Sequence, residues 1–261
     1  MHNDFAELVR IMARLRGENG CAWDKEQTYD TIRPYLLEET YEVIETILDK
    51  NFEGLKEELG DLLLQVVFLS QIAADEKRFS IDDVVRTINE KLIRRHPHVF
   101  GDEETNDTNV ILKKWEDIKK KEKADKNIEH KSILDGVPKI LPALTQAHKI
   151  QGKAKRVGFD FPDHHEAFKK VHEEVTELEE ELNAGEQNAN RIEEEIGDLL
   201  FAVTNVARML SIDAEGALMK ANRKFRSRFS GIEDHFAKKG KDLTSVTLAE
   251  MDAVWEEQKR A

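Results

Sequence analysis

Two short acidic motifs occur in the same order at two places in the chain. Each place has a Glu-Glu-x-x-Glu motif followed by a Glu-x-x-Asp motif. Residues three or four apart on a helix share a face, so two antiparallel helices carrying these motifs would bring four carboxylates together. Close carboxylates repel one another unless a cation lies between them, and oxygen ligands suit Mg²⁺ or Mn²⁺. The later set is Glu174, Glu177, Glu195 and Asp198, and the earlier set is Glu39, Glu42, Glu58 and Asp61.

The simpler interpretation is that these glutamates are solvated positions of good helix formers. The two motifs occur as a pair, and the pair occurs at two places in the chain, which favours a metal site instead. Gly60 and Gly197 lie inside the second motif and each weakens a helix by about 1 kcal/mol relative to Ala, which indicates close approach of a helix or a ligand. A di-iron centre is disfavoured because it needs Glu-x-x-His pairs, which these motifs lack.

A basic segment follows the second acidic set. Lys224 and Arg228 are four residues apart on a predicted helix, and Arg226 lies between them. A divalent ion flanked by Lys and Arg is suited to binding a polyphosphate, because the Lys and Arg side chains neutralise the phosphate charge that the metal ion does not neutralise. A solvated basic face is the alternative. Trp255 could stack on a base, although core packing or a dimer contact explains it equally well.

The composition narrows the function classes. The chain has 261 residues, 36% of them charged, and a net charge of −13, so general affinity for nucleic acid is not expected. The single cysteine, Cys21, excludes an internal disulfide and a cysteine-based zinc cluster. The N-terminus does not resemble a signal peptide, and no apolar run is long enough to cross a bilayer. We therefore expect a cytoplasmic protein that does not associate with membranes. The motifs of ATP-driven motors and of dinucleotide enzymes are absent from the sequence.

The chain is a tandem duplication. Five blocks recur in order at offsets between 133 and 140; for example, Glu58–Leu63 recurs as Glu195–Leu200, and Trp23-Asp24 is answered by Phe159-Asp160. The sequence predicts an N-terminal repeat over 1–118, a charged linker over 119–137 and a C-terminal repeat over 138–261. The charge run in the linker is typical of a solvated linker or a helix extension.

Apolar periodicity predicts helices in each repeat. Stripes of helical spacing occur at 37–48, 55–69 and 81–92, and a further helix that includes Leu15 is answered by one that includes Ile150. Ser80 with Asp83 predicts a capping box, and Asp213 is expected to cap the matching helix. Four amphipathic helices per repeat predict an all-α, bundle-like fold.

These residues together resemble the MazG family of nucleoside triphosphate pyrophosphohydrolases, in its two-repeat bacterial type. The resemblance covers essentially the whole chain. It implies an all-α homodimer that converts a nucleoside triphosphate to the monophosphate and pyrophosphate, with Mg²⁺ as cofactor and Mn²⁺ as a substitute. It also implies broad base specificity and a role in nucleotide-pool control or house-cleaning.

The resemblance assigns roles residue by residue. The metal ligands and catalytic groups would be Glu174, Glu177, Glu195 and Asp198. Substrate contacts would be Lys170, Glu173, Arg191, Glu194, Lys224, Phe225, Arg226, Arg228 and Trp255. A second site in the first repeat would use Glu39, Glu42, Glu58, Asp61, Lys91 and Arg95.

The mechanistic hypothesis is in-line attack of water on the α-phosphorus. A glutamate of the Glu-Glu-x-x-Glu helix assists deprotonation of the water, and Lys224 and Arg228 stabilise the departing pyrophosphate. Spacing alone does not distinguish attack at the α-phosphorus from attack at the γ-phosphorus; only the resemblance selects the former. A helical adaptor without catalysis and a nucleic-acid phosphodiesterase are the alternatives, and the net charge disfavours the second.

The two repeats are expected to be unequal. Lys170 and Arg191 stand one turn before Glu174 and Glu195, and so lie on the same helix faces. Tyr35 and Gly54 occupy the matching positions in the first repeat. Because a triphosphate carries several negative charges, we expect the second repeat to carry most of the catalysis.

Overall fold

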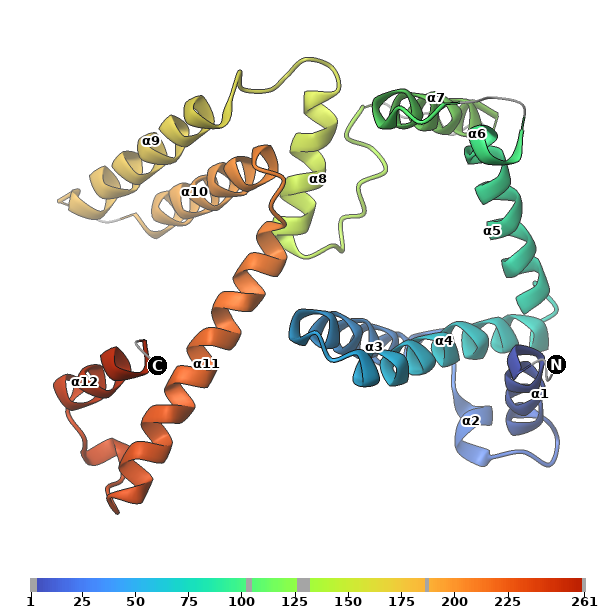
Figure 1. Cartoon of the computed structure of the whole chain (residues 1–261), viewed down its shortest axis with the longest axis horizontal. Coiled ribbons are helices and arrows are strands. Elements are labelled where there is room, and N and C mark those ends of the chain that lie inside the picture. Colours follow the sequence, from blue (N-terminus) through green and yellow to red (C-terminus); the bar gives the residue numbers. More distant parts are fainter. Residues whose placement is uncertain (1–3, 102–104, 126–131, 186–187, 260–261) are drawn as a thin grey trace. The chain divides into compact units, whose positions relative to one another are not determined.

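The computed structural model describes residues 4–101, 105–125, 132–185 and 188–259, and these are helical throughout, with turns between the helices and no strand (Figure 1). The all-α prediction is confirmed. The chain divides into two compact units, one up to residue 128 and one from residue 129.

A long helical pair forms the centre of unit 1. α3 (Tyr29–Asp49) and α4 (Phe52–Asp75) pack side by side (Figure 1). The turn between them uses Lys50 in the left-handed conformation, with a φ of 55°. Asn51 then caps α4 by accepting the backbone N–H of Gly54 at 3.0 Å. These caps fix where the two acidic helices begin and end.

The core of unit 1 lies where α1 (Asp4–Arg16) crosses α4. Its buried side chains are Met12, Ile32, Val67, Phe68, Ile72 and Ile81. Each comes from an apolar stripe of helical spacing, and burial of such side chains is the main stabilising term of a helical domain. α2 (Ala22–Glu26) packs beside α1.

The remaining helices of unit 1 extend from this core. α5 (Ile81–Arg95) begins with the predicted capping box, in which Ser80 and Asp83 exchange hydrogen bonds. The short α6 (Pro97–Phe100) follows it, so the His96-Pro97-His98 segment is both a helix stop and a new helical turn. α7 (Thr108–Asp125) contains the first residues of the predicted linker, and residues 126–131 of that linker lie outside the described residues.

Unit 2 repeats the central helical pair. α9 (His164–Asn183) packs against α10 (Ala189–Met209), and α8 (Ala143–Lys155) crosses α10. Asp163 caps α9 by accepting the backbone N–H groups of His165 and Glu166. The capped start of α9 sets the register of the Glu-Glu-x-x-Glu motif.

A second apolar cluster joins the C-terminal helices of unit 2. α11 (Ala214–Lys238) leads through the 3₁₀ turn η1 (Leu243–Ser245) to α12 (Leu248–Gln258), and it contacts α10 and α8 less than it contacts α12. The buried residues of this cluster are Ile232, Phe236, Val246 and Val254. Most of α11 therefore extends away from the α9–α10 pair (Figure 1).

One local prediction is wrong, and a second is wrong in part. Asp213 stands at the N-cap position of α11 but its side chain accepts no capping hydrogen bond. Its carboxylate lies beside Gly216 instead. A Cβ atom added at Gly216 would lie only 2.5 Å from Oδ2 of Asp213. Gly60 and Gly197 do not mark a close helix contact, because a Cβ atom at either position would meet no atom within 4 Å. The alternative, close approach of a ligand, stays a prediction.

Candidate metal and triphosphate site

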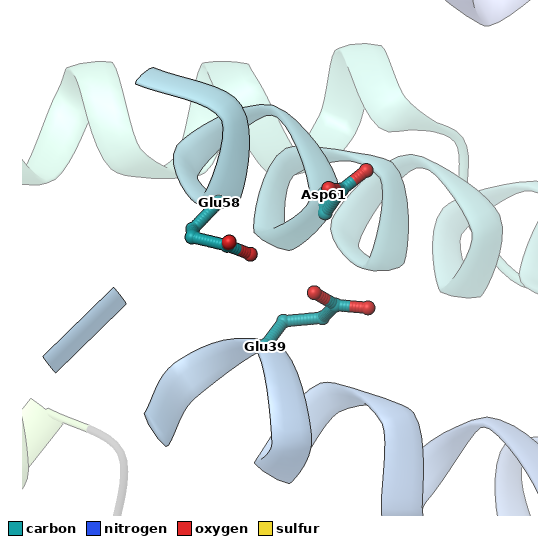
Figure 2. Close-up of side chains that lie close together, drawn as sticks. All are labelled: Glu39, Glu58 and Asp61. Atoms are coloured by element: carbon teal, nitrogen blue, oxygen red, sulfur yellow. The ribbon is translucent and has the colours of Figure 1, made fainter. Parts of the chain in front are cut away.

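Three carboxylates of unit 1 face one another across the α3–α4 pair. Glu39 comes from α3, and Glu58 and Asp61 come from α4 (Figure 2). One carboxylate oxygen of each lies within 4.8 Å of the other two. Glu42, the fourth residue of the predicted set, shares hydrogen bonds with Glu39 and Glu58. The motif spacing predicted a group of four carboxylates, and three of the four lie within this distance of one another.

Unit 2 contains the same arrangement on α9 and α10. Oxygens of Glu174, Glu195 and Asp198 lie within 4.8 Å of one another, and Glu177 shares a hydrogen bond with Glu174. Glu174 is buried, with 4% of its surface exposed. A buried carboxylate is destabilising unless a cation or a hydrogen-bond donor contacts it, so Glu174 needs such a partner more than the other three carboxylates do.

The pKa values of Glu39 and Glu195 are raised, first by partial burial and then by the charges of neighbouring carboxylates. Partial burial, followed by the charges of Asp61 and Glu42, raises the pKa of Glu39. Partial burial and the charges of Glu174 and Asp198 raise the pKa of Glu195 in the same way. A divalent cation would reverse this effect by neutralising the charges. The donor set consists of carboxylate oxygens without His or Cys, which fits a hard cation such as Mg²⁺ or Mn²⁺.

The two clusters differ in the group that contacts the first metal-ligand candidate, which is the buried Glu174 in unit 2 and the half-buried Glu39 in unit 1. In unit 2, Lys170 Nζ lies 2.6 Å from Glu174 Oε1 and 2.6 Å from Glu173 Oε1. In unit 1, the partner of Glu39 is the neutral amide of Gln65, whose Nε2 donates to Oε1 at 3.4 Å. Tyr35 occupies the position that matches Lys170 and packs edge-on against Trp23. Only the second cluster therefore has a lysine at this position.

Arg191 does not lie over Glu195 as its spacing suggested. Its Nε pairs with Glu181 Oε1 of α9 at 3.1 Å, so it joins the far ends of the two helices. Gly54, at the matching position of unit 1, takes part in the cap of α4. Of the two cations expected at the rim, Lys170 alone contacts the acidic cluster in the described contacts.

The basic residues of α11 form a group of their own with α12. The guanidinium carbon of Arg228 lies 5.6 Å from the ring centroid of Trp255, and the rings of Phe225 and Trp255 are 5.1 Å apart. Lys224 and Arg226 are on the same helix. Within the described residues, no ion pair or hydrogen bond is found between these five side chains and the acidic cluster. The roles that the resemblance implies, triphosphate contacts for Lys224 to Arg228 and a nucleotide contact for Trp255, stay predictions.

The cations proposed for the first repeat have another partner. Arg95 Nη2 lies 2.6 Å from Glu122 Oε2, and Arg94 Nη2 lies 2.6 Å from Glu122 Oε1. Glu122 belongs to α7, so these pairs attach α7 to the end of α5. Arg95 is therefore committed to a structural ion pair, and Lys91 is half-buried on α5.

Sequence reasoning did not predict the cavity beside the second cluster. It has a volume of about 900 Å³ and reaches Lys170, Glu174 and Asp198 at one end. Its lining is mainly apolar and includes Phe159, Phe161 and Phe201. The sequence feature that could have indicated this cavity is the recurring aromatic-Asp block, Trp23-Asp24 and Phe159-Asp160. Asp160 lines the cavity and forms an ion pair with Arg208, which lines it too.

An all-helical unit with a Glu-Glu-x-x-Glu helix packed against a Glu-x-x-Asp helix defines the class of all-α nucleotide pyrophosphohydrolases. The family model described as the MazG nucleotide pyrophosphohydrolase domain matches this chain twice, at residues 27–100 and 163–231. The chain belongs to the MazG family, and the predicted two-repeat organisation is confirmed by the two matches. Both segments include a complete pair of acidic helices.

Two full-length relatives support this assignment. The chain is 48% identical over 259 residues to the nucleoside triphosphate pyrophosphohydrolase of Escherichia coli (strain K12), covering 99% of this chain and 98% of that protein. It is 47% identical over 255 residues to the nucleoside triphosphate pyrophosphohydrolase/pyrophosphatase MazG of Thermotoga maritima, covering 98% and 95%. Among the described residues, no helix has both the length and the apolarity needed to cross a membrane.

Proposed function

We propose that this chain is a nucleoside triphosphate pyrophosphohydrolase, which converts NTP and water to NMP and pyrophosphate. The observation that carries the proposal is the buried Glu174 grouped with Glu195 and Asp198, in a chain whose full-length relatives are named for this reaction. Several bases are accepted, as expected for control of the nucleotide pool in the cytoplasm.

The cluster of unit 2 holds the metal in this proposal. Glu174, Glu177, Glu195 and Asp198 would bind Mg²⁺, which supplies charge neutralisation and polarisation of phosphate oxygens when it is bound. Lys170 adds a positive charge next to Glu174, and both residues line the cavity. Such a cation strengthens the binding of phosphate oxygens.

Side chains of the protein also accept the proton of the attacking water and stabilise the departing pyrophosphate in this proposal. A glutamate of α9 accepts the proton of the attacking water, which requires a carboxylate within hydrogen-bond reach of that water. Lys224 and Arg228 stabilise the charge that develops on the departing pyrophosphate. Trp255 and Phe225 offer aromatic faces for the nucleoside.

We further propose that two copies of the chain form the working enzyme. Ile196, Leu200 and Val203 lie on one stripe of α10 and are 45%, 50% and 47% exposed. The matching residues of α4, Leu59, Leu63 and Val66, are exposed as well. An apolar stripe of this kind on both central helices is typical of a surface covered by a second subunit.

Product analysis tests the proposal. The protein is incubated with each of the four NTPs and Mg²⁺, and the products are separated and quantified. We expect NMP and pyrophosphate in equal amounts, no turnover in excess EDTA, and recovery with Mg²⁺ or Mn²⁺. Diphosphate and orthophosphate as primary products would overturn the assigned bond, full activity in EDTA would overturn the metal site, and absence of any turnover would favour the adaptor.

A further inference from the structure

The two units differ in the size of three side chains next to their acidic clusters. In unit 2, Ala167, Ala202 and Asn205 line the cavity together with Glu174 and Asp198. Ala167 lies two helical turns before Glu174 on α9, so it shares the helix face of that carboxylate. Ala202 lies one turn after Asp198 on α10 and shares its face in the same way. The small side chains on these faces therefore border the open volume beside the cluster.

Larger side chains occupy the matching positions of unit 1. With the acidic motifs of the two repeats aligned, the matching pairs are Ile32 and Ala167, Gln65 and Ala202, and Phe68 and Asn205. Ile32 and Phe68 are 1% and 4% exposed and belong to one apolar cluster. The guanidinium carbon of Arg16 lies 5.5 Å from the centroid of the Phe68 ring. Side chains of unit 1 thus fill the region that corresponds to the unit 2 cavity.

Gln65 also contacts the acidic cluster of unit 1. It is 7% exposed, and its Nε2 donates to Glu39 Oε1 at 3.4 Å. Ala202, at the matching position, has no polar side-chain atom, and it lines the cavity with Glu174 instead. A side chain that bonds the cluster from within the fold excludes a ligand from the same volume, because protein interiors are close-packed.

We propose that Ala167 and Ala202 admit a nucleoside triphosphate to the cluster of unit 2, whereas the larger side chains of unit 1 exclude it from the first cluster. Phosphate groups near Glu174 need free volume beside that carboxylate, and the two alanines leave it. This steric difference acts in addition to the charge of Lys170. The alanines determine specificity and take no part in the chemistry. The inference rests on the proposed function and names the residues that decide which unit takes the substrate.

Equilibrium binding to the unmodified protein is the first test. The probe is α,β-methylene-ATP with Mg²⁺, in which a methylene group replaces the bridging oxygen that the reaction releases. Isothermal titration calorimetry gives the number of bound nucleotides per chain, and we expect one. Two nucleotides of similar affinity per chain would overturn the inference, because unit 1 would then admit nucleotide in spite of its larger side chains.

Transfer of the unit 1 glutamine to unit 2 is the second test. In Ala202→Gln we expect kcat/KM for pyrophosphate release from ATP to fall about thirtyfold or more, equivalent to about 2 kcal/mol, and the Kd of the analogue to rise by a similar factor. Ala202→Ser changes the size little and should stay close to the unmodified values. Ala207→Gln is the matched control, because Ala207 is a half-buried alanine of the same helix that does not line the cavity.

Unmodified affinity for the analogue in a folded Ala202→Gln would overturn the inference. An equal loss in Ala202→Ser or in Ala207→Gln would overturn it too, because the size of the side chain at position 202 would then not be the cause. Circular dichroism checks folding, and the stoichiometry of the unmodified protein decides the matter even if Ala202→Gln does not fold. One bound analogue per chain without any pyrophosphate release from ATP would overturn the proposed function alone.

Discussion

Lys170 Nζ lies 2.6 Å from Glu174 Oε1, so the most buried carboxylate of the acidic cluster in unit 2 is paired with a cation from its own helix. The pairs with Glu173 and Glu174 raise the pKa of Lys170, which keeps it charged at any pH of interest. A metal ion bound to Glu174 would compete for the same oxygen. Lys170 would then turn its charge toward the phosphates.

Replacement of this lysine should weaken substrate binding. We expect Lys170→Met to raise KM for ATP about fivefold to tenfold, because one charge-assisted contact contributes about 1 kcal/mol or more. Lys169→Met is the control, since Lys169 pairs with Glu166 outside the cluster. Steady-state kinetics at saturating Mg²⁺ measure both variants. An unchanged KM in Lys170→Met would show that this lysine does not contact substrate.

The two acidic clusters should contribute unequally to catalysis. We expect Glu174→Ala with Glu177→Ala to lower kcat/KM at least a hundredfold. Both residues belong to the proposed metal site of unit 2, which adjoins Lys170 and the cavity. Glu39→Ala with Glu42→Ala should stay within about threefold of the unmodified protein. Pyrophosphate release is measured after circular dichroism has confirmed folding. If the unit 1 variant is the inactive one, the catalytic unit is assigned wrongly.

We expect the glycine at position 197 to lower the stability of its helix and to support activity. A Cβ atom at this helix-interior position meets nothing within 4 Å in the chain, so Gly197→Ala should stabilise the helix by about 0.5–1 kcal/mol. Because it lies between Glu195 and Asp198, we expect kcat/KM to fall several-fold through contact with substrate or a second subunit. Thermal unfolding and kinetics are compared with Gly60→Ala, which should also stabilise but change activity less. Higher stability with full activity would remove any role for this glycine in ligand approach.

Glu122 should make unit 1 sensitive to acid. Hydrogen bonds from Arg95, followed by those from Arg94, lower the pKa of Glu122 to about 2. Because the folded pKa lies below the usual value of 4.5, the unfolded state binds more protons between these values. The stabilisation is therefore complete above about pH 5 and is lost as pH falls toward 2.

We expect Glu122→Gln to lower the unfolding free energy by about 1 kcal/mol at pH 7, after allowance for solvent screening of the exposed Arg94. Urea unfolding at pH 7 and at pH 3 should show this difference shrinking at the lower pH. Glu53→Gln serves as the control, because Glu53 forms only an exposed pair with Lys56. A difference that is independent of pH would show that the ion pairs do not stabilise α7.

The sequence by itself determined the local features of this protein. Spacing of three and four residues placed Glu39 with Glu42 and Glu195 with Asp198 on common helix faces, because helix geometry is set by the backbone alone. The repeat of whole blocks fixed the duplication, and the Ser80 cap followed from a signal within four residues. Asp213 shows the limit of such signals, since the same position in the second repeat carries no capping bond.

Tertiary structure decided which partner each charged side chain has. Lys170 and Arg191 both precede a glutamate by one turn, yet Lys170 pairs with Glu174 of its own helix whereas Arg191 crosses to Glu181 of α9. Arg95 pairs with Glu122, 27 residues away, and Gln151 reaches the carbonyl of Phe201 across two helices. Long side chains have several rotamers that spacing does not distinguish, and the packing of helices distant in sequence selects among them.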